Sequence, residues 1–373
     1  MKGHIRERSP GHWAIVLDVS DPQTGKRRRK WHSFRGTKRE AQRECARLIA
    51  EIGQGRYVEA SKKTVGEFVQ SRITQWEAAG DITAGSAQRY QVLLDNQIMP
   101  HLGTRPLQKL TRLELERWHT ALRSDGLTAR TIGHAHRLLG KALSDAEKDD
   151  LVVKNVCKIQ KVPKVAKSEV PIVRDVPGLV EKMRGSRLYV QAIIALFTGM
   201  RLGEILALKE ERVKLDIGKI EVRESLEETK AHGVRFKRPK TEAGRRDITL
   251  PTIVIEALRQ HRKEVLETRM RLGLGKSDSQ SLLFANIEGG PLRLRAVSEA
   301  WGGLAERIGM PEITFHALRH THASQLIDAG VGIVTITKRV GHSKPDITLR
   351  TYAHLFKTDD SKAAAAINAA LKT

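Results

Sequence analysis

Four segments in the second half of the chain carry arginine, lysine, histidine and tyrosine side chains at ordered spacing. In chain order they read TGMRLGEIL, PKTEAGRRDI, HALRH, and GHS with a tyrosine ten residues after its histidine. These residue types are the ones that bind phosphate esters and move protons near neutral pH. The candidate side chains are Arg201, Lys240, His316, Arg319, His342 and Tyr352.

Each of these side chains has a chemical use at a phosphodiester. Arg201 and Arg319 carry forked N–H donors that match its two non-bridging oxygens. Lys240 and the histidines can donate or accept protons. The hydroxyl of Tyr352 becomes a nucleophile when its proton is removed, and its attack leaves a covalent intermediate. No cluster of Asp and Glu accompanies the set. The pattern therefore predicts phosphoryl transfer without a metal and disfavours a two-metal nuclease.

Alternative interpretations exist for each residue taken alone. His316 and His320 lie four positions apart and could bind zinc on one helix face, but no Glu stands between them and no third ligand is evident. An arginine at a helix start or a lysine in a turn is usually only solvated, and Tyr352 alone could be a packed core residue. The ordered set of six favours the chemical interpretation.

The composition points to a polyanionic partner. The chain has 373 residues, with 66 Lys and Arg against 43 Asp and Glu, a formal net charge of +23. Nucleic acid is the commonest partner of such a surplus. No apolar run approaches the length of a spanning helix and no signal peptide is visible, so we expect no membrane partner and a cytoplasmic protein. Two distant cysteines suit a reducing compartment.

Residues 1–60 read as a separate basic unit. Strands are expected over 13–19 and 31–34, with a turn at 21–25 and a helix over 37–52. Adjacent like charges repel each other unless an anion offsets them, so we predict DNA contact for the basic run, although it could serve solubility alone. The run consists of Lys26, Arg27, Arg28, Arg29 and Lys30.

The next two regions differ in periodicity. Residues 64–156 predict a bundle of four helices, the second of which is expected to stop at Pro100. Residues 157–171 predict a linker because they are basic and lack apolar periodicity. Lys158, Lys161 and Lys164 are candidate contacts to a DNA backbone, and an ordinary flexible tether is the alternative.

Residues 172–357 show a mixed pattern. Helices are expected over 188–197, 251–269, 293–309, 315–329, 332–340 and 346–357. A strand is expected over 213–223, and a hairpin over 234–250 with its turn at 241–244. The alanine-rich tail, residues 358–373, predicts a final helix.

These motifs carry a family resemblance. Residues 172–357 resemble the tyrosine recombinase (phage integrase) family, and the resemblance is carried by the sequence motifs TGMRLGEILAL, HALRHTHAS and GHSKPDITLRTYAHL. Residues 64–156 resemble its SAM-like core-binding domain. Residues 1–60 resemble, more loosely, the arm-binding domain of larger integrases such as that of phage lambda. One departure is Asn155-Val156, where many relatives carry Asn-Pro, and it affects only the linker entry.

The resemblance implies a fold and a mechanism. The fold would be multidomain α+β, with a three-stranded N-terminal sheet plus helix, a four-helix bundle, and a mainly helical catalytic domain with a small antiparallel sheet. Arg201 and Arg319 would clamp the scissile phosphate, Tyr352 would form a 3′-phosphotyrosine, and Lys240 would protonate the leaving oxygen. The remaining implied roles are proton transfer by His316, a phosphate hydrogen bond from His342, and support from behind by Glu204 and His320, the last of which could instead be merely packed.

The resemblance also implies partners. Double-stranded DNA would be bound at core and arm sites by a tetramer, and the C-terminal tail would pack on a neighbouring protomer or fold back in cis. A host DNA-bending protein and an excisionase are further candidate partners, and no cofactor is expected. The expected function is integration, with excision as a second direction, of a prophage or other mobile element. The alternatives are type IB topoisomerase-like relaxation and a catalytically silent DNA-binding or architectural protein.

Overall fold

The computed structural model describes residues 3–20, 27–53, 58, 61–165, 171–230, 232–239, 242–353, 368, 370 and 371. The chain forms two compact units, residues 1–166 and 167–373. The division between them falls within the predicted linker. The predicted turn at 21–25, Lys26, Lys240 and nearly all of the tail lie outside the described residues. None of the helices within the described ranges combines the length and apolar composition that a membrane-spanning segment needs.

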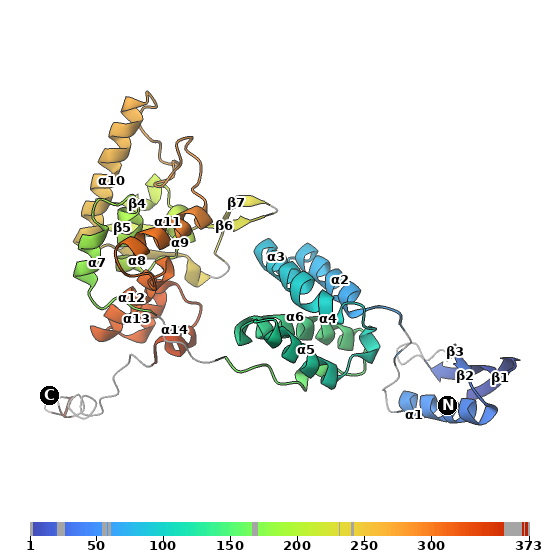
Figure 1. The fold of residues 1–373 in the computed structure, drawn as a ribbon. Coiled ribbons are helices and arrows are strands. Elements are labelled where there is room, and N and C mark those ends of the chain that lie inside the picture. The colour runs from blue at the N-terminus through green and yellow to red at the C-terminus, as the bar shows by residue number, and fades with distance from the viewer. Residues whose placement is uncertain are drawn as a thin grey trace. The chain divides into compact units, whose positions relative to one another are not determined.

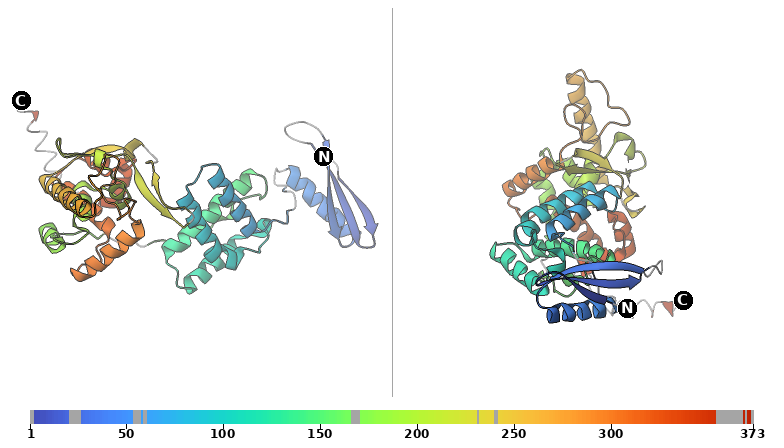
Figure 2. Two further views of the ribbon diagram at one scale, coloured as in Figure 1. Left: turned by 90° about the horizontal axis from the view of Figure 1, so that it is seen from above. Right: turned by 90° about the vertical axis from the view of Figure 1, so that its right-hand side faces the viewer.

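The N-terminal part of the first unit is an antiparallel sheet of three strands in the order β1-β2-β3, with one helix against it. Its buried core holds Ile15 and Leu17 from the sheet and Cys45 and Leu48 from the helix, and Figure 2 shows the helix along one face of the strands. The predicted sheet with a backing helix is therefore confirmed. The elements are β1 (Gly3–Ser9), β2 (His12–Ser20), β3 (Arg27–Arg35) and α1 (Lys38–Gly53).

The rest of the first unit is a helical bundle. Each of its four main helices begins at a threonine whose side chain accepts a hydrogen bond from a backbone N–H three residues later, a stabilising N-cap. The elements are α2 (Val65–Ala78), α3 (Ala84–Leu93), the π-helical turn η1 (Leu94–Ile98), α4 (Met99–Leu102), η2 (Leu107–Lys109), α5 (Arg112–Ser124), α6 (Ala129–Lys148) and η3 (Val156–Lys158).

The second bundle helix does not stop at Pro100, as the sequence predicted. It passes through η1, where the N–H of Met99 donates to the carbonyl of Leu94 five residues back, and continues to Leu102 as α4. The π turn starts a new helical segment with Pro100 in its first turn. Proline is tolerated in a first turn because the N–H that it lacks needs no partner there.

The residues at the start of the predicted linker fold against the bundle. Asn155 donates from its side-chain nitrogen to the carbonyl of Gly140 and accepts from the N–H of Cys157. Cys157 is buried, and Lys158 pairs with Glu147 at 2.5 Å. Residues 161–165 follow without regular secondary structure.

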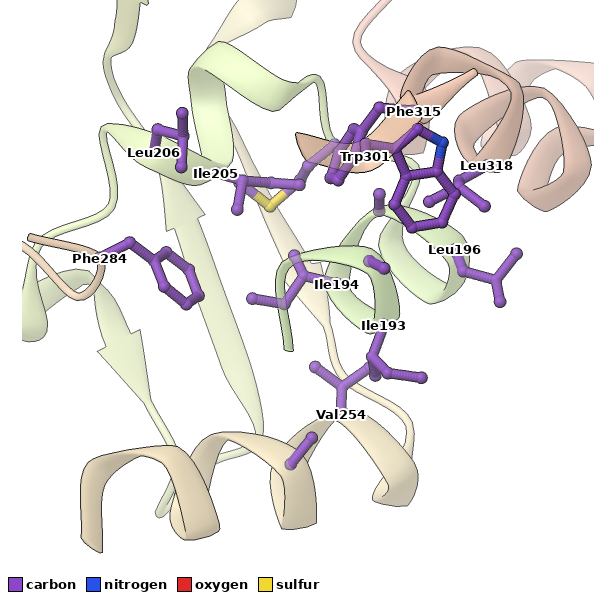
Figure 3. Close-up of a cluster of buried hydrophobic side chains, with 14 of the residues drawn as sticks. Ile193, Ile194, Leu196, Ile205, Leu206, Val254, Phe284, Trp301, Phe315 and Leu318 are labelled. Atoms are coloured by element: carbon purple, nitrogen blue, oxygen red, sulfur yellow. The ribbon is translucent and has the colours of Figure 1, made fainter. Parts of the chain in front are cut away.

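The second unit is a helical domain around the apolar helix α8 (Tyr189–Thr198), which packs against α10 (Thr252–Arg271) and α12 (Phe315–Asp328). Figure 3 shows Ile193, Ile194 and Leu196 of this helix among side chains from its neighbours. The other helices are α7 (Val176–Met183), α9 (Leu202–Leu206), η4 (Glu210–Arg212), η5 (Glu242–Gly244), α10 (Thr252–Arg271), α11 (Leu294–Arg307), α12 (Phe315–Asp328), α13 (Ile333–Val340) and α14 (Pro345–Tyr352).

The strands of this unit pair differently from the prediction. The expected hairpin over 234–250 does not form: β7 pairs with β6, and β8 pairs with β5. The reason is burial, because Ile248 of β8 lies opposite Ile220 in the core, whereas β6 and β7 form the separate two-stranded ribbon visible in Figure 1. The strands are β4 (Val213–Lys214), β5 (Lys219–Val222), β6 (Ser225–Thr229), β7 (Gly233–Lys237) and β8 (Arg246–Thr249).

Candidate active site

Arg201 lies at the turn between α8 and α9. Gly199 ends α8 with a φ of +69°, and a Cβ there would come within 2.7 Å of the His322 ring, so only glycine fits this turn. Arg201 then caps α9, where its backbone N–H donates to Glu204 Oε2 at 2.9 Å. Its guanidinium donates from Nη1 to Glu204 Oε1 at 2.9 Å and from Nη2 to the carbonyl of Gly341 at 3.2 Å.

Glu204 is a buried carboxylate held between two arginines. Arg246 of β8 donates to its oxygens at 2.8 and 3.2 Å, and also donates from Nε to the carbonyl of Arg339 at 2.8 Å. Burial alone would raise the pKa of Glu204, but Arg246 and Arg201 lower that pKa to about 2. The carboxylate therefore stays ionised and fixes both guanidinium groups.

Arg246 was absent from the sequence-based set of site residues. Its side chain is only 6% exposed. A signal for it exists in the strand 246–249, where Arg246 and Ile248 alternate with exposed residues and so share the buried face. A buried arginine requires a negatively charged or hydrogen-bonding partner. The alternation of buried and exposed residues in the strand does not identify which carboxylate provides it.

Arg319 of α12 is the most deeply buried cation of the site, at 2% exposure. Its Nη1 donates to the carbonyl of Gly199, while its Nη2 is buried without a hydrogen-bond partner. Burial and the charge of Arg201 lower its pKa to about 9. A buried donor without an acceptor is costly, and an anion brought to this position would satisfy it.

Tyr352, at the end of α14, is buried in a small apolar cluster with residues of α12 and α13. Its Oη lies 2.6 Å from Nδ1 of His320. Burial raises the pKa of Tyr352 to about 12 against the opposing charge of Arg319. Burial, His316 and Arg319 lower the pKa of His320 to about 4. At neutral pH the pair is therefore a neutral phenol and a neutral imidazole.

His316 lies one turn before His320 on α12. The two rings meet edge to face with centroids 4.6 Å apart. Burial and the charges of Arg319 and Arg201 lower the pKa of His316 as well. His316 thus contacts the histidine that bonds Tyr352.

His342 follows the left-handed Gly341 that ends α13. A Cβ at Gly341 would come within 2.7 Å of the Arg246 guanidinium, so the turn packs directly on that arginine. His342 Nδ1 lies 2.8 Å from the hydroxyl of Thr348, and burial, followed by Arg319, lowers its pKa to about 4. His342, Arg201 and Glu204 line a cavity of about 700 Å³ with residues of the β6–β7 ribbon.

The structure thus brings five of the six predicted catalytic residues into one region of the second unit: Arg201, Arg319 and His342 around the guanidinium cluster, and His316 and Tyr352 around His320. Lys240 lies outside the described residues, and its neighbours Arg238 and Pro239 line the same cavity. Among the described residues, no three His, Cys, Asp or Glu side chains are grouped as a metal site would require.

The predicted DNA-binding residues are found in three settings. Arg29 is largely exposed, with its Nε 3.5 Å from Asp18, whereas Lys158 is paired with Glu147. Lys161 and Lys164 are exposed in the segment after η3. Arg27, Arg28 and Lys30 belong to β3.

Comparison with known families decides the class. Residues 175–359 match the phage integrase family, residues 5–52 an arm DNA-binding domain, and residues 70–123 the N-terminal SAM-like domain of phage integrases. The chain belongs to the phage integrase family. Members of this tyrosine recombinase family cleave and rejoin DNA, so this integrase is an enzyme of site-specific recombination that integrates mobile elements.

Relatives and solved structures agree with this assignment over nearly the whole chain. An integrase of Streptomyces ambofaciens is 28% identical over 91% of this chain and 88% of its own length. An integrase of Mycobacterium phage L5 is 24% identical over 84% of this chain and 81% of its own.

Among solved structures, the Tn1549 transposon integrase in complex with transposon right end DNA has a TM-score of 0.70 at 22% identity, covering 82% of this chain and 99% of the other. A lambda integrase dimer bound to a core site has a TM-score of 0.57 at 18% identity, covering 93% of each chain. The shared fold includes the sheet, the helical bundle and the catalytic unit.

Proposed function

We propose that Tyr352 is the nucleophile with which this integrase cleaves DNA. Its Oη would attack the scissile phosphorus, the bond from phosphorus to the 5′ oxygen would break, and Lys240 would give that oxygen its proton. A 3′-phosphotyrosine and a free 5′-hydroxyl result, and attack by a 5′-hydroxyl of the partner strand reverses the step. Because the covalent bond conserves the energy of the phosphodiester, joining needs neither ATP nor a metal.

The observation that carries this proposal is the unsatisfied donor of Arg319. Its buried Nη2 has no partner, and Arg201 and Arg246 add two more cations around the single carboxylate of Glu204. A phosphodiester would satisfy the donor and offset the positive charge. Preorganised donors of this kind stabilise a developing oxyanion, and loss of one typically costs about 10²–10³ in rate. His342 would add a further hydrogen bond from the cavity side.

We further propose that residues 64–156 bind the core site and residues 1–60 the arm site. The register of the N-terminal sheet separates two faces. Gly3, Ile5, Ile15 and Leu17 face α1, since a Cβ at Gly3 would touch Leu17 and Cys45. The next positions therefore lie on the opposite, open face, where we place the arm DNA: Arg6, Arg8, Arg29, Trp31 and Arg35.

The active assembly would be a tetramer on DNA in the cytoplasm, with the catalytic domain, residues 172–357, tied to the core-binding domain by the linker at 157–171. A DNA-bending host protein and an excisionase would set direction. The solved lambda integrase tetramer bound to a Holliday junction supports this proposal through the shared fold, with a TM-score of 0.55.

The test uses a nicked suicide substrate that traps the covalent complex. We expect the wild-type integrase to form an adduct in the presence of EDTA. Tyr352→Phe should bind the same DNA and form none, because a phenyl ring has no oxygen to attack phosphorus. Loss of the wild-type adduct in EDTA would contradict the metal-free mechanism.

The same assay separates the other candidate functions. Relaxation of a supercoiled plasmid without an attachment site would indicate a topoisomerase-like activity, and DNA binding with no adduct from the wild type would indicate an architectural protein. An adduct that persists in Tyr352→Phe would overturn the assignment of the nucleophile.

A further inference from the structure

The sequence predicts that His320 only positions other site residues, but in the structure it contacts Tyr352, the proposed nucleophile, directly. The 2.6 Å between Nδ1 and Oη lies at the short end of the range for a hydrogen bond that involves a hydroxyl. Tyr352 is 1% exposed, and its ring meets that of His320 with centroids 5.6 Å apart. The oxygen that must attack phosphorus is thus held against a ring nitrogen.

The protonation states of the pair make Tyr352 the proton donor and His320 the acceptor before cleavage. With a pKa of about 4, His320 is neutral at pH 7 and carries one nitrogen lone pair, while Tyr352, with a pKa of about 12, keeps its proton. In the tautomer that has its hydrogen on Nε2, the phenol donates to Nδ1. The imidazole is then placed to accept the proton that the nucleophile must lose.

We propose that His320 is the catalytic base that removes the proton from Tyr352, a role that rests on Tyr352 being the nucleophile proposed above. As the bond from Oη to phosphorus forms, the proton moves from Oη to Nδ1. The bond from phosphorus to the 5′ oxygen breaks, and the general acid protonates that oxygen. During rejoining, Nδ1 returns the proton to the departing phenol oxygen.

The charges around His320 would couple this base to the substrate. The groups that face it are His316 and Arg319 from its own helix, the Tyr352 hydroxyl from α14, and His342 just after α13, whose charge also interacts with that of His320. Without DNA, the cations disfavour a proton on His320. A phosphodiester bound at Arg319 and Arg201 offsets those charges and raises the proton affinity of the imidazole. Tyr352 is then activated only when a phosphate is in place.

The experiment compares two leaving groups in the full-length integrase. An ordinary suicide substrate requires both a base and an acid, whereas a substrate with sulfur in place of the 5′ bridging oxygen releases a thiolate that needs no proton. His320→Gln keeps a hydrogen-bonding group but removes the base. Lys240→Ala removes the proposed acid. His261→Gln is the matched control, because this histidine of α10 bonds the carbonyl of Leu283 and takes no part in the site.

We expect His320→Gln to bind DNA normally and to form adduct about 10²–10⁴-fold more slowly on both substrates, the range typical of a lost acid or base. The sulfur substrate should restore Lys240→Ala alone. The wild-type rate should fall at acid pH as His320 becomes protonated, and the glutamine variant should lose that dependence. His261→Gln should match the wild type throughout.

Two results would overturn the role of His320. One is a wild-type or higher rate of adduct formation in His320→Gln, which would mean that the contact only holds the tyrosine side chain in place before DNA binds. The other is rescue of His320→Gln by the sulfur substrate, which would mean that His320 acts on the leaving group and not on Tyr352. If His320→Gln melts early, His320→Asn replaces it under the same criteria. An adduct in Tyr352→Phe would instead refute the proposed nucleophile, so the two failures are distinguishable.

Discussion

Glu204 is the residue on which the arrangement of the arginines depends. It accepts hydrogen bonds from Arg201 and Arg246, which come from different elements, and its carboxylate is 6% exposed. Removing the charge of one member of such a buried group leaves the others uncompensated, typically at a cost of about 3–5 kcal/mol. Glu204 therefore sets both the stability of the site and the geometry of the donors proposed to bind phosphate.

This role gives a prediction for stability against pH. The folded-state pKa of Glu204, about 2, lies below its ordinary value of 4.5, so the carboxylate stabilises the fold above pH 4.5 and this contribution is lost as pH falls toward 2. The difference corresponds to about 3 kcal/mol. In urea titrations, the unfolding free energy of the second unit should fall by about that much more in the wild type than in Glu204→Gln.

Glu306→Gln, the same chemical change at an exposed position of α11, should retain the wild-type pH profile. Parallel profiles for the wild type and Glu204→Gln between pH 5 and pH 2 would contradict the buried ionic arrangement.

At the scale of elements, the sequence predicted which segments form helices and strands better than it predicted how they pair. Apolar periodicity located the bundle helices, yet the helix through Pro100 depended on a π turn that leaves no sequence signal. The pairing of β8 with β5 depends on Ile248 filling the core opposite Ile220. Tertiary packing decides the course of this helix and the pairing of these strands, and the apolar periodicity of the sequence does not predict it.

The same limit applies to the site. Residue types and order were enough to select Arg201, His316, Arg319, His342 and Tyr352, because their chemistry is unusual as a set. The partner of Glu204 was missed, since Arg246 lies far along the chain and its burial follows from the β5–β8 pairing. The hydrogen bond between Tyr352 and His320 likewise depends on how α12 meets α14.

The two faces of the N-terminal sheet give a prediction for arm binding. Arg6→Ala on the open face should weaken binding to DNA from the ends of the element and lower the slope of log K against log salt by about 1, as expected for one lost phosphate contact. Arg43→Ala on α1 removes the same charge from an exposed helix position and should leave both quantities unchanged. Equal effects of the two variants would refute the open face as the DNA surface.

At the scale of the whole molecule, the net charge of +23 is distributed over parts with different tasks. Part of it is concentrated in the guanidinium cluster of the catalytic unit, and part lies on the N-terminal sheet and in the linker. The two DNA-binding parts proposed for this chain would allow the integrase to bridge separate sites, because the second contact would be made at high effective concentration.

Deletion of residues 1–60 tests whether arm binding and catalysis reside in separate parts of the chain. We expect the shortened chain to form the covalent adduct on a core-site substrate as the full chain does, since the proposed catalytic residues all lie in the second unit. Complete integration between two attachment sites should be impaired. Full recombination activity of the shortened chain would remove the arm-binding role from this region.

In the proposed mechanism Tyr352 becomes covalently joined to DNA, and the position of that bond can be determined. The adduct trapped on a suicide substrate would be digested with protease and nuclease, and the modified peptide sequenced by mass spectrometry. We predict a single nucleotide attached through its 3′-phosphate to Tyr352. Attachment to any other residue, or through a 5′-phosphate, would contradict the mechanism.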